Sequence, residues 1–306
     1  MPGLSGSVSN RPVIRQVAKL LSIASIGLCF IGGQTLLQAQ DNEAIVIRPQ
    51  LIEFPGAQFV ALPEPKLHAT APKAEKEALL ESIAGKVGWK RFSANSINAP
   101  VRIEVEELKD DSGKRTGYRI RSSYVIYCSR EKLENRDLME SSFGKPKAPD
   151  DPNRKLDQLA LKALEEDEFA TDDESRQYLW IELPLLKKVL IRAVLVAKNS
   201  QADGAFQLTW GVDSRFSQDG GEYQHRWSKL STNQLGRIVE GETQPYQGMG
   251  GKMSVTPTGL AADQWLIESV LVIHEPDEWF GSSQYLRSKL PAALQESAKS
   301  FRRKLR

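Results

Sequence analysis

Histidines are the side chains in this sequence best suited to acid–base or metal chemistry, because imidazole titrates near neutral pH and is a common metal ligand. His68, His225 and His274 lie far apart, and none has another histidine or a cysteine three or four positions away, as zinc sites have. His274 precedes Glu275-Pro276-Asp277, but adjacent residues of a strand point to opposite faces of a sheet. We expect no metal site, and we interpret His274 as the end of a strand with its acidic neighbours in solvent. In an enzyme, His225 and His274 would be the candidate bases.

Other catalytic patterns are missing from the sequence. No serine lies in a Gly-x-Ser-x-Gly segment, and Asp213 and Asp219 have no evident partner. Gly248, Gly250 and Gly251 lack the spacing and the following lysine of a phosphate-binding loop, so we interpret them as a flexible turn. We therefore expect a non-catalytic domain without a cofactor, with an enzyme of unrecognised type as the remaining alternative.

Large aromatic side chains could stack on a sugar or line a pocket. They are Trp210, Trp227, Trp265, Trp279, Tyr124 and Tyr127. Large aromatics within strands usually belong to the core, and we favour that interpretation. The acidic stretch 165–174 lacks the glycine-containing loop with alternating oxygen ligands of a calcium site, so we expect it to be a solvated surface.

The first 39 residues are typical of a secretory signal peptide. The first 19 residues carry three basic and no acidic side chains, and an apolar or small run from Leu20 to Gly33 follows. A positive segment, about 7–15 apolar residues and a small residue at the cut form the export pattern, so we expect cleavage after Ala39. A retained anchor is the alternative, but a spanning helix needs about 20 apolar residues, which here would include Gln34 and Thr35. We expect a secreted or periplasmic protein with no transmembrane span after cleavage.

The rest of the chain is close to neutral. The chain of 306 residues has 41 Lys and Arg against 39 Asp and Glu, and the signal segment contains three of the basic residues. Net charge therefore gives no indication of nucleic-acid binding. Cys128 is the only cysteine beyond the signal, which excludes an internal disulfide. It lies in the apolar run Tyr124–Cys128, and we interpret it as a small buried hydrophobe.

The elements that must position these residues begin after a lead-in. Residues 40–72 contain five prolines, which interrupt helices and lack the donor that a central strand needs, so this segment is predicted to be extended. Residues 73–306 are predicted to form a single α+β domain. It begins with a helix over 73–87, followed by a hairpin whose strands cover 101–105 and 118–126 around a turn at Asp110–Gly113.

Further along, Ser129 is of the type preferred at an N-cap, and it predicts a helix to about Ser142. Residues 145–153 are expected to form a loop, and apolar residues at helical spacing predict a second helix over 156–164. The second half of the chain is rich in strands, with candidates at 189–197, 206–212, 223–227, 252–255 and 264–273.

The C-terminal segment has the clearest helical pattern. Its apolar residues recur every three or four positions, at Leu286, Leu290, Leu294, Ala298, Phe301 and Leu305. Pro291 is expected to kink or break this helix. The basic residues that crowd its end complement the helix dipole.

The order of these elements resembles the helix-grip arrangement of the steroidogenic-acute-regulatory-related lipid-transfer (START-like) domains. The local match is the strand Leu266–Ile273 with His274-Glu275-Pro276, then Trp279-Phe280, then the terminal helix with Pro291. The resemblance spans about residues 74–306. It implies an antiparallel, curved sheet packed against a long C-terminal helix, with inserted helices and an apolar tunnel between sheet and helix.

This resemblance implies binding of a lipid or another apolar small molecule, and with the export segment and the missing catalytic patterns it predicts an exported, non-catalytic binding domain. The side chains that would line its pocket are Tyr124, Trp210, Leu286, Leu290 and Leu294. The alternative is a structural or protein-interaction domain of an exported assembly, in which the same apolar stripe only fills the core.

Overall fold

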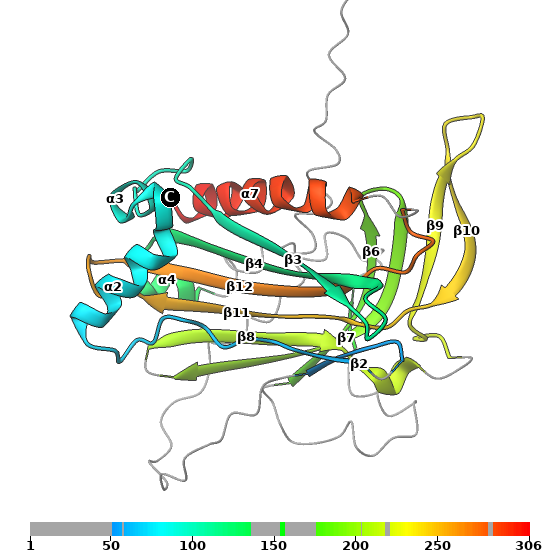
Figure 1. Ribbon diagram of the computed structural model, residues 1–306, viewed down its shortest axis with the longest axis horizontal. Helices are drawn as coiled ribbons and strands as arrows, with labels where there is room; N and C mark the ends of the chain where they lie inside the picture. Colours follow the sequence, from blue (N-terminus) through cyan, green and yellow to red (C-terminus); the bar gives the residue numbers. More distant parts are fainter. Residues whose placement is uncertain are drawn as a thin grey trace, which may run out of the picture.

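The described part of the chain forms one curved, antiparallel sheet with a long helix on its concave face (Figure 1). The computed structural model describes residues 51–56, 58–135, 154–156, 176–202, 204–217, 221–280 and 284–306. Ten strands join in the order β10-β9-β7-β8-β11-β12-β4-β3, with β6 paired to β7 and β5 paired to β6. The predicted fold class, α+β with a curved antiparallel sheet on a long C-terminal helix, is confirmed.

The strands of the large sheet are β3 (Arg102–Lys109), β4 (Arg115–Tyr127), β5 (Arg154–Lys155), β6 (Arg176–Leu185), β7 (Val189–Ala202), β8 (Ala205–Val212), β9 (Arg226–Thr232), β10 (Ile238–Pro245), β11 (Met249–Pro257) and β12 (Gln264–His274). A separate hairpin consists of β1 (Leu51–Phe54) and β2 (Gln58–Ala61). The helices are α2 (Lys73–Ala84), α3 (Trp89–Phe92), α4 (Arg130–Glu134) and α7 (Tyr285–Leu305). Within these residues no helix combines the length and the apolarity needed to cross a bilayer.

The predicted hairpin of β3 and β4 is confirmed, and its turn shows why it forms there. Asp110 Oδ1 accepts hydrogen bonds from the backbone N–H groups of Ser112 (2.9 Å) and Lys114 (3.0 Å). Gly113 has φ +82°, a conformation that glycine adopts without the steric cost of a Cβ atom. The turn directs β4 back along β3, and β4 then pairs with β12 over its whole length.

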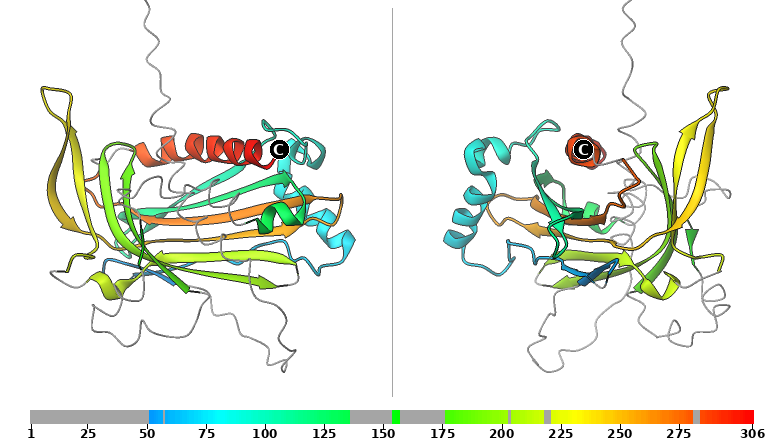
Figure 2. Two further views of the ribbon diagram at one scale, coloured as in Figure 1. Left: turned by 180° about the vertical axis from the view of Figure 1, so that it is seen from behind. Right: turned by 45° about the vertical axis from the view of Figure 1, so that its right-hand side comes forward.

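Helix α7 follows the trough of the sheet. Its buried side chains recur every three or four residues and join the largest apolar cluster of the described chain. In the right-hand view of Figure 2, which looks along α7, the sheet curves up on both sides of the helix. Pro291 lies in the second turn, and α7 continues through it without a break.

The convex face of the sheet carries the lead-in and α2. Ile52 and Phe54 of β1 pack against Leu108 and Val272, and Leu80 of α2 belongs to a second cluster on the same side. The chain between β2 and α2 crosses this face between the two clusters (Figure 1). The described residues between Leu51 and Leu67 are therefore part of the folded body.

Several local predictions were wrong. Gly250 and Gly251 lie inside β11, and a Cβ at Gly250 would lie 2.2 Å from Ile52 Cδ1, so close packing of β1 requires glycine there. Ser129 caps α4 as expected, accepting from the Lys132 N–H at 3.4 Å, but this helix ends at Glu134 and not near Ser142.

Other predictions fall partly or wholly outside the described residues. Of the predicted second helix, only Leu156 is described, and it directly follows β5. The signal segment, the loop at 145–153 and the acidic stretch 165–174 fall on residues that are not described.

Candidate functional site

The predicted ligand-binding residues lie together between α7 and the concave face of the sheet. Leu286, Leu290 and Leu294 come from one stripe of α7 and Trp210 from β8, and each is at most 4% exposed. Tyr124 of β4 packs against the same apolar cluster, and burial raises the pKa of its hydroxyl. The structure thus brings all five residues to one interface. Their contact with a ligand stays a prediction.

The C-terminal end of α7 is fixed by a buried arginine. Arg302 is only 5% exposed, and it donates to the carbonyl oxygens of Val125 (2.9 Å) and Ala99 (2.6 Å). Its guanidinium also lies over the Tyr124 ring, 5.4 Å from the ring centroid. Lys132 Nζ donates to the Leu305 carbonyl at 3.0 Å. These bonds tie the last two turns of α7 to β4 and to the loop before β3.

The N-terminal end of α7 is held differently. An ion pair between Arg287 Nη1 and Glu107 Oε1 of β3 (2.9 Å) joins the first turn to the sheet, and the Arg287 side chain is largely exposed. Surface ion pairs typically contribute only about 0–1 kcal/mol. Leu286 and Leu290 are fully buried in the main apolar cluster at this end, and the rings of Phe280 and Tyr285 lie 5.3 Å apart between centroids. The polar contacts that anchor the two ends of α7 are therefore unequal, with the weaker set at the N-terminal end.

Buried polar groups lie in the apolar interior near this N-terminal end. Trp279 Nε1 is buried and makes no hydrogen bond in the described structure, while the buried Tyr118 hydroxyl lies against the Glu275 carboxylate, which accepts from it. The Trp279 ring stacks on Tyr246 at 5.5 Å between centroids and contacts Trp227. Burying a polar group without a partner costs free energy. Trp279 Nε1 therefore marks a place where a polar group of another molecule would gain a hydrogen bond.

Glu275 lies beside Tyr118 and is buried, contrary to the expected solvated acid. Its carboxylate is 6% exposed and lies 3.4 Å from the Arg115 guanidinium. Burial raises the pKa of Glu275, and Arg115 opposes that effect. Burial, with the nearby charge of Glu275, raises the pKa of Tyr118 to about 12. Asp277, by contrast, is exposed and pairs with Lys114.

The two candidate bases are packing residues. Burial lowers the pKa of both His225 and His274 to about 4, so both are neutral at pH 7. His225 stacks on Phe216, and His274 meets the edge of Phe54 at 5.4 Å between centroids. His274 thus ends its strand as predicted. No group of three His, Cys, Asp or Glu side chains that could hold a metal ion occurs in the described residues.

The other candidates from the sequence are also buried. Cys128 is 6% exposed, and burial raises the pKa of its thiol to about 12, which confirms the small-hydrophobe interpretation. The large aromatics from the strands are core residues, and Trp210, Trp227, Trp265 and Trp279 are each at most 6% exposed.

A cavity of about 50 Å³ lined by both apolar and charged side chains lies on the convex face. Its floor is formed by β4, β11 and β12, and the lead-in residues 63–66 cover one side. The residues lining it include Arg121, Ser123, Lys252, Ser254 and Glu268.

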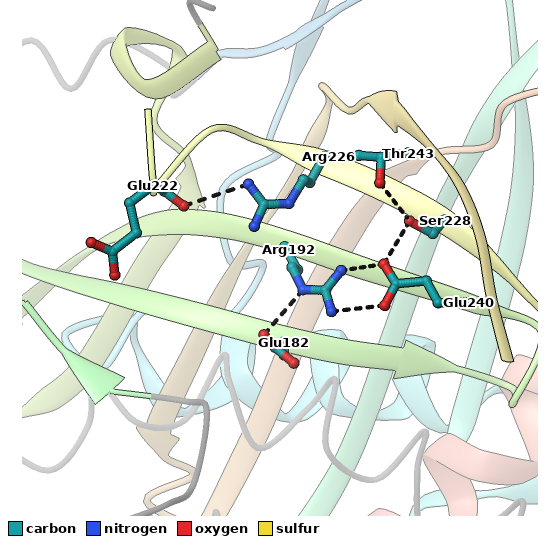
Figure 3. Close-up of polar contacts among 7 residues, drawn as sticks. All are labelled: Glu182, Arg192, Glu222, Arg226, Ser228, Glu240 and Thr243. Atoms are coloured by element: carbon teal, nitrogen blue, oxygen red, sulfur yellow. Dashed lines mark hydrogen bonds and ion pairs between the residues drawn. The ribbon is translucent and has the colours of Figure 1, made fainter. Parts of the chain in front are cut away.

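A partly buried arginine network holds the β9–β10 hairpin to the sheet (Figure 3). Arg192 of β7 forms two hydrogen bonds with the Glu240 carboxylate of β10, and its Nε donates to Glu182 of β6 at 3.0 Å. Ser228 of β9 donates to the same Glu240 at 2.9 Å. Because Arg192 holds Glu240, the pKa of that carboxyl is lowered. One guanidinium therefore bridges three strands at the root of the hairpin.

The tip of this hairpin extends beyond the body of the sheet (Figure 1) and exposes apolar side chains. Leu235 is 77% exposed, Ile238 63% and Val239 43%. Lys229 and Arg237 lie beside them, and residues 229–239 contain no acidic side chain. This combination forms an apolar and basic projection.

Arg302 was interpreted from the sequence as one of several C-terminal cations, although its position gave a usable signal. It is one residue after Phe301 and four after Ala298, so helical spacing places it on the buried stripe. The convex-face cavity offered no such signal, because its residues come from strands and a lead-in that are distant in sequence.

No known protein-family model matches the sequence, and a search of curated proteins gives no match. A search of solved structures finds the human StarD13 (DLC2) lipid transfer and protein localization domain as a similar structure. It is 9% identical, with a TM-score of 0.41, and the match covers 67% of this chain and 84% of that domain.

Proposed function

We propose that this chain is an exported, non-catalytic domain that binds an apolar small molecule with a polar end between α7 and the concave face of the sheet. The export pattern of the first 39 residues supports the compartment, with cleavage after Ala39. The unpartnered Trp279 Nε1 at one end of the apolar cluster, with the buried Tyr118 hydroxyl near it, is the observation that carries the binding proposal.

The polar end of the ligand is expected to be uncharged. Trp279 offers a hydrogen-bond donor, but the neighbouring Glu275 carboxylate would repel a second carboxylate. A hydroxyl or carbonyl group satisfies this donor without that repulsion. A monoacylglycerol therefore fits this end of the interface better than a free fatty acid.

Entry of a ligand requires α7 to move, because side chains fill the interface in this structure. Ligand pockets have volumes of about 300–1,000 Å³. The weaker polar anchor of α7, at its N-terminal end, is adjacent to Tyr118 and Trp279, so opening at that end would place the ligand's polar group beside them. Met249 and Met253 lie in the same cluster, and methionine adapts readily to changes in packing.

The test uses monoolein as the probe, followed by native mass spectrometry and by fluorescence of the interior tryptophans. Wild-type protein should bind one monoolein and bind oleate more weakly at pH 7. Tyr118→Phe should weaken monoolein binding by about tenfold. It should also lower the stability of the ligand-free protein by about 1 kcal/mol, because the removed hydroxyl donates to Glu275 there.

Tyr246→Phe is the matched control. Tyr246 is equally buried, and its hydroxyl donates to the His274 carbonyl at 3.4 Å. This variant should lose some stability and keep its affinity for monoolein. Absence of monoolein binding, or equal affinity in Tyr118→Phe and wild type, would refute the proposal.

The alternative, a protein-interaction domain of an exported assembly, is favoured by the hairpin tip. Leu235 and Ile238 with Arg237 would suit a partner whose surface is apolar and acidic. If a protein co-purifies with the wild type from its host, Leu235→Ser together with Ile238→Ser should release it, while Gln234→Ser should not. Retention of the partner by the double variant would contradict this reading.

A further inference from the structure

The convex-face cavity is independent of α7 and of the proposed ligand interface. It lies between the lead-in and the outer surface of β4, β11 and β12. A cavity needs about 10–15 Å³ to hold one water molecule. Its volume of about 50 Å³ therefore has room for a small polyatomic ion.

The carboxylates that line this cavity already have partners. Glu104 accepts from Arg102 Nε at 2.8 Å, and Glu64 pairs with Lys252. Glu268 accepts from the backbone N–H groups of Lys66 (3.1 Å) and Leu67 (3.0 Å). These contacts also fasten the lead-in over the cavity. The acidic groups therefore leave little capacity for a bound cation.

The groups without partners are hydrogen-bond donors. Arg121 Nε is buried and unpartnered, and no hydrogen bond or ion pair engages this guanidinium among the described residues. Ser254 is only 1% exposed, and its hydroxyl also has no partner. The Ser123 hydroxyl lines the same cavity. An unpaired cation beside free hydroxyls suits an acceptor that carries negative charge.

We propose that this cavity binds a small oxyanion, a carboxylate or a phosphate group, through the Arg121 guanidinium and the hydroxyls of Ser254 and Ser123. The lead-in forms one wall of this site, so a bound anion would contact both the lead-in and the sheet. An anion there would be enclosed by residues 63–66 as well as by the sheet.

Calorimetric titration of the full chain tests the proposal, with inorganic phosphate, glycerol phosphate, acetate and chloride at constant ionic strength. Binding of phosphate or acetate with a measurable heat, and none of chloride, is expected. If either phosphate probe binds more tightly than acetate, the ligand is a phosphate group. If glycerol phosphate binds more tightly than inorganic phosphate, the ligand is an esterified phosphate head group. Tighter binding of acetate would assign a carboxylate. If no oxyanion binds more tightly than chloride, the proposal is overturned.

The variants locate the site. Arg121→Met should weaken oxyanion binding by at least about tenfold, and Ser254→Ala should weaken it by about threefold with little change in the fold. Arg119→Met is the matched control, because Arg119 lies two residues away on the same face of β4 and is engaged by Glu106 at 2.9 Å. Unchanged binding in both Arg121→Met and Ser254→Ala, or an equal loss in Arg119→Met, would overturn the assignment.

Discussion

Replacing Arg302 by methionine should destabilise the fold strongly, although the residue lies four positions before the last residue of the chain. The guanidinium donates to Ala99 at 2.6 Å and Val125 at 2.9 Å, and more weakly to Ile97 (3.4 Å) and Pro100 (3.3 Å). Methionine has a similar length but offers no donor. The variant would leave these carbonyl groups without their partner.

The magnitude follows from the two short bonds. Hydrogen bonds from a charged donor contribute about 1.5–3 kcal/mol each, which gives about 3–6 kcal/mol for the pair. Burial opposes this gain, as the lowered pKa of Arg302 indicates, and removing a buried cation recovers part of its desolvation cost. We therefore expect Arg302→Met to lower the free energy of unfolding by about 2–4 kcal/mol.

Urea unfolding followed by tryptophan fluorescence measures this change. Arg303→Met is the matched control, since Arg303 is exposed on the next position of α7, and its effect should stay within about 0.5 kcal/mol. Arg302→Lys keeps the charge but lacks the planar fork that reaches several carbonyls, so it should restore less than half of the loss. An effect of Arg302→Met below about 1 kcal/mol, or full restoration by lysine, would refute the reasoning.

Three further predictions concern pH, ligand entry and close packing. Burial lowers the pKa of His274 from 6.5 to about 4, so the unfolded chain binds a proton first and the free energy of unfolding falls as the pH drops from about 6.5 to 4. His274→Gln should remove up to about 3 kcal/mol of that loss, measured by urea unfolding at pH 7 and pH 4.5; an unchanged pH dependence would contradict this. Arg287→Met should speed monoolein uptake by severalfold in stopped-flow fluorescence. Lys299→Met, which breaks an ion pair within α7, should leave the rate unchanged. Equal uptake rates in the two variants would argue against opening at the N-terminal end of α7. Gly250→Ala should lower the free energy of unfolding by about 1–3 kcal/mol in the same urea assay. Gly241→Ala should lower it clearly less, because a Cβ at Gly241 would lie 3.5 Å from its nearest neighbouring atom. Equal losses in the two variants would show that β1 adapts to the added methyl group.

The parts of the fold that the sequence predicts are those with strong local patterns. The stripe of α7 is visible because one face of a helix is buried along its whole length. The β3–β4 hairpin is visible because its turn residues and its alternation agree. Likewise, the nearly continuous apolar run of β7 predicts a central strand, and β7 pairs with β6, β8 and β9.

The strands β6 and β10 escaped prediction for physical reasons. Strand β10 is exposed along its whole length, so it has no buried face to produce alternation, and it is held by β9 and by the Arg192–Glu240 contact. Strand β6 contains Pro184, which weakens the strand signal. For the interior site, the element order of a helix-grip fold pointed to the five residues at the α7 interface. The unpartnered Trp279 Nε1 and the buried contact of Tyr118 with Glu275 depend on packing that a sequence does not report.

The lead-in has a consequence for the time course of folding. Lys66 and Leu67 donate to Glu268, 202 and 201 residues later in the chain, and Ile52 packs on β11 near Gly250. Contacts between such distant segments are slow to form, because a long loop must close before they contribute. The earliest described segment therefore gains its binding surface only after most of the chain has been synthesised.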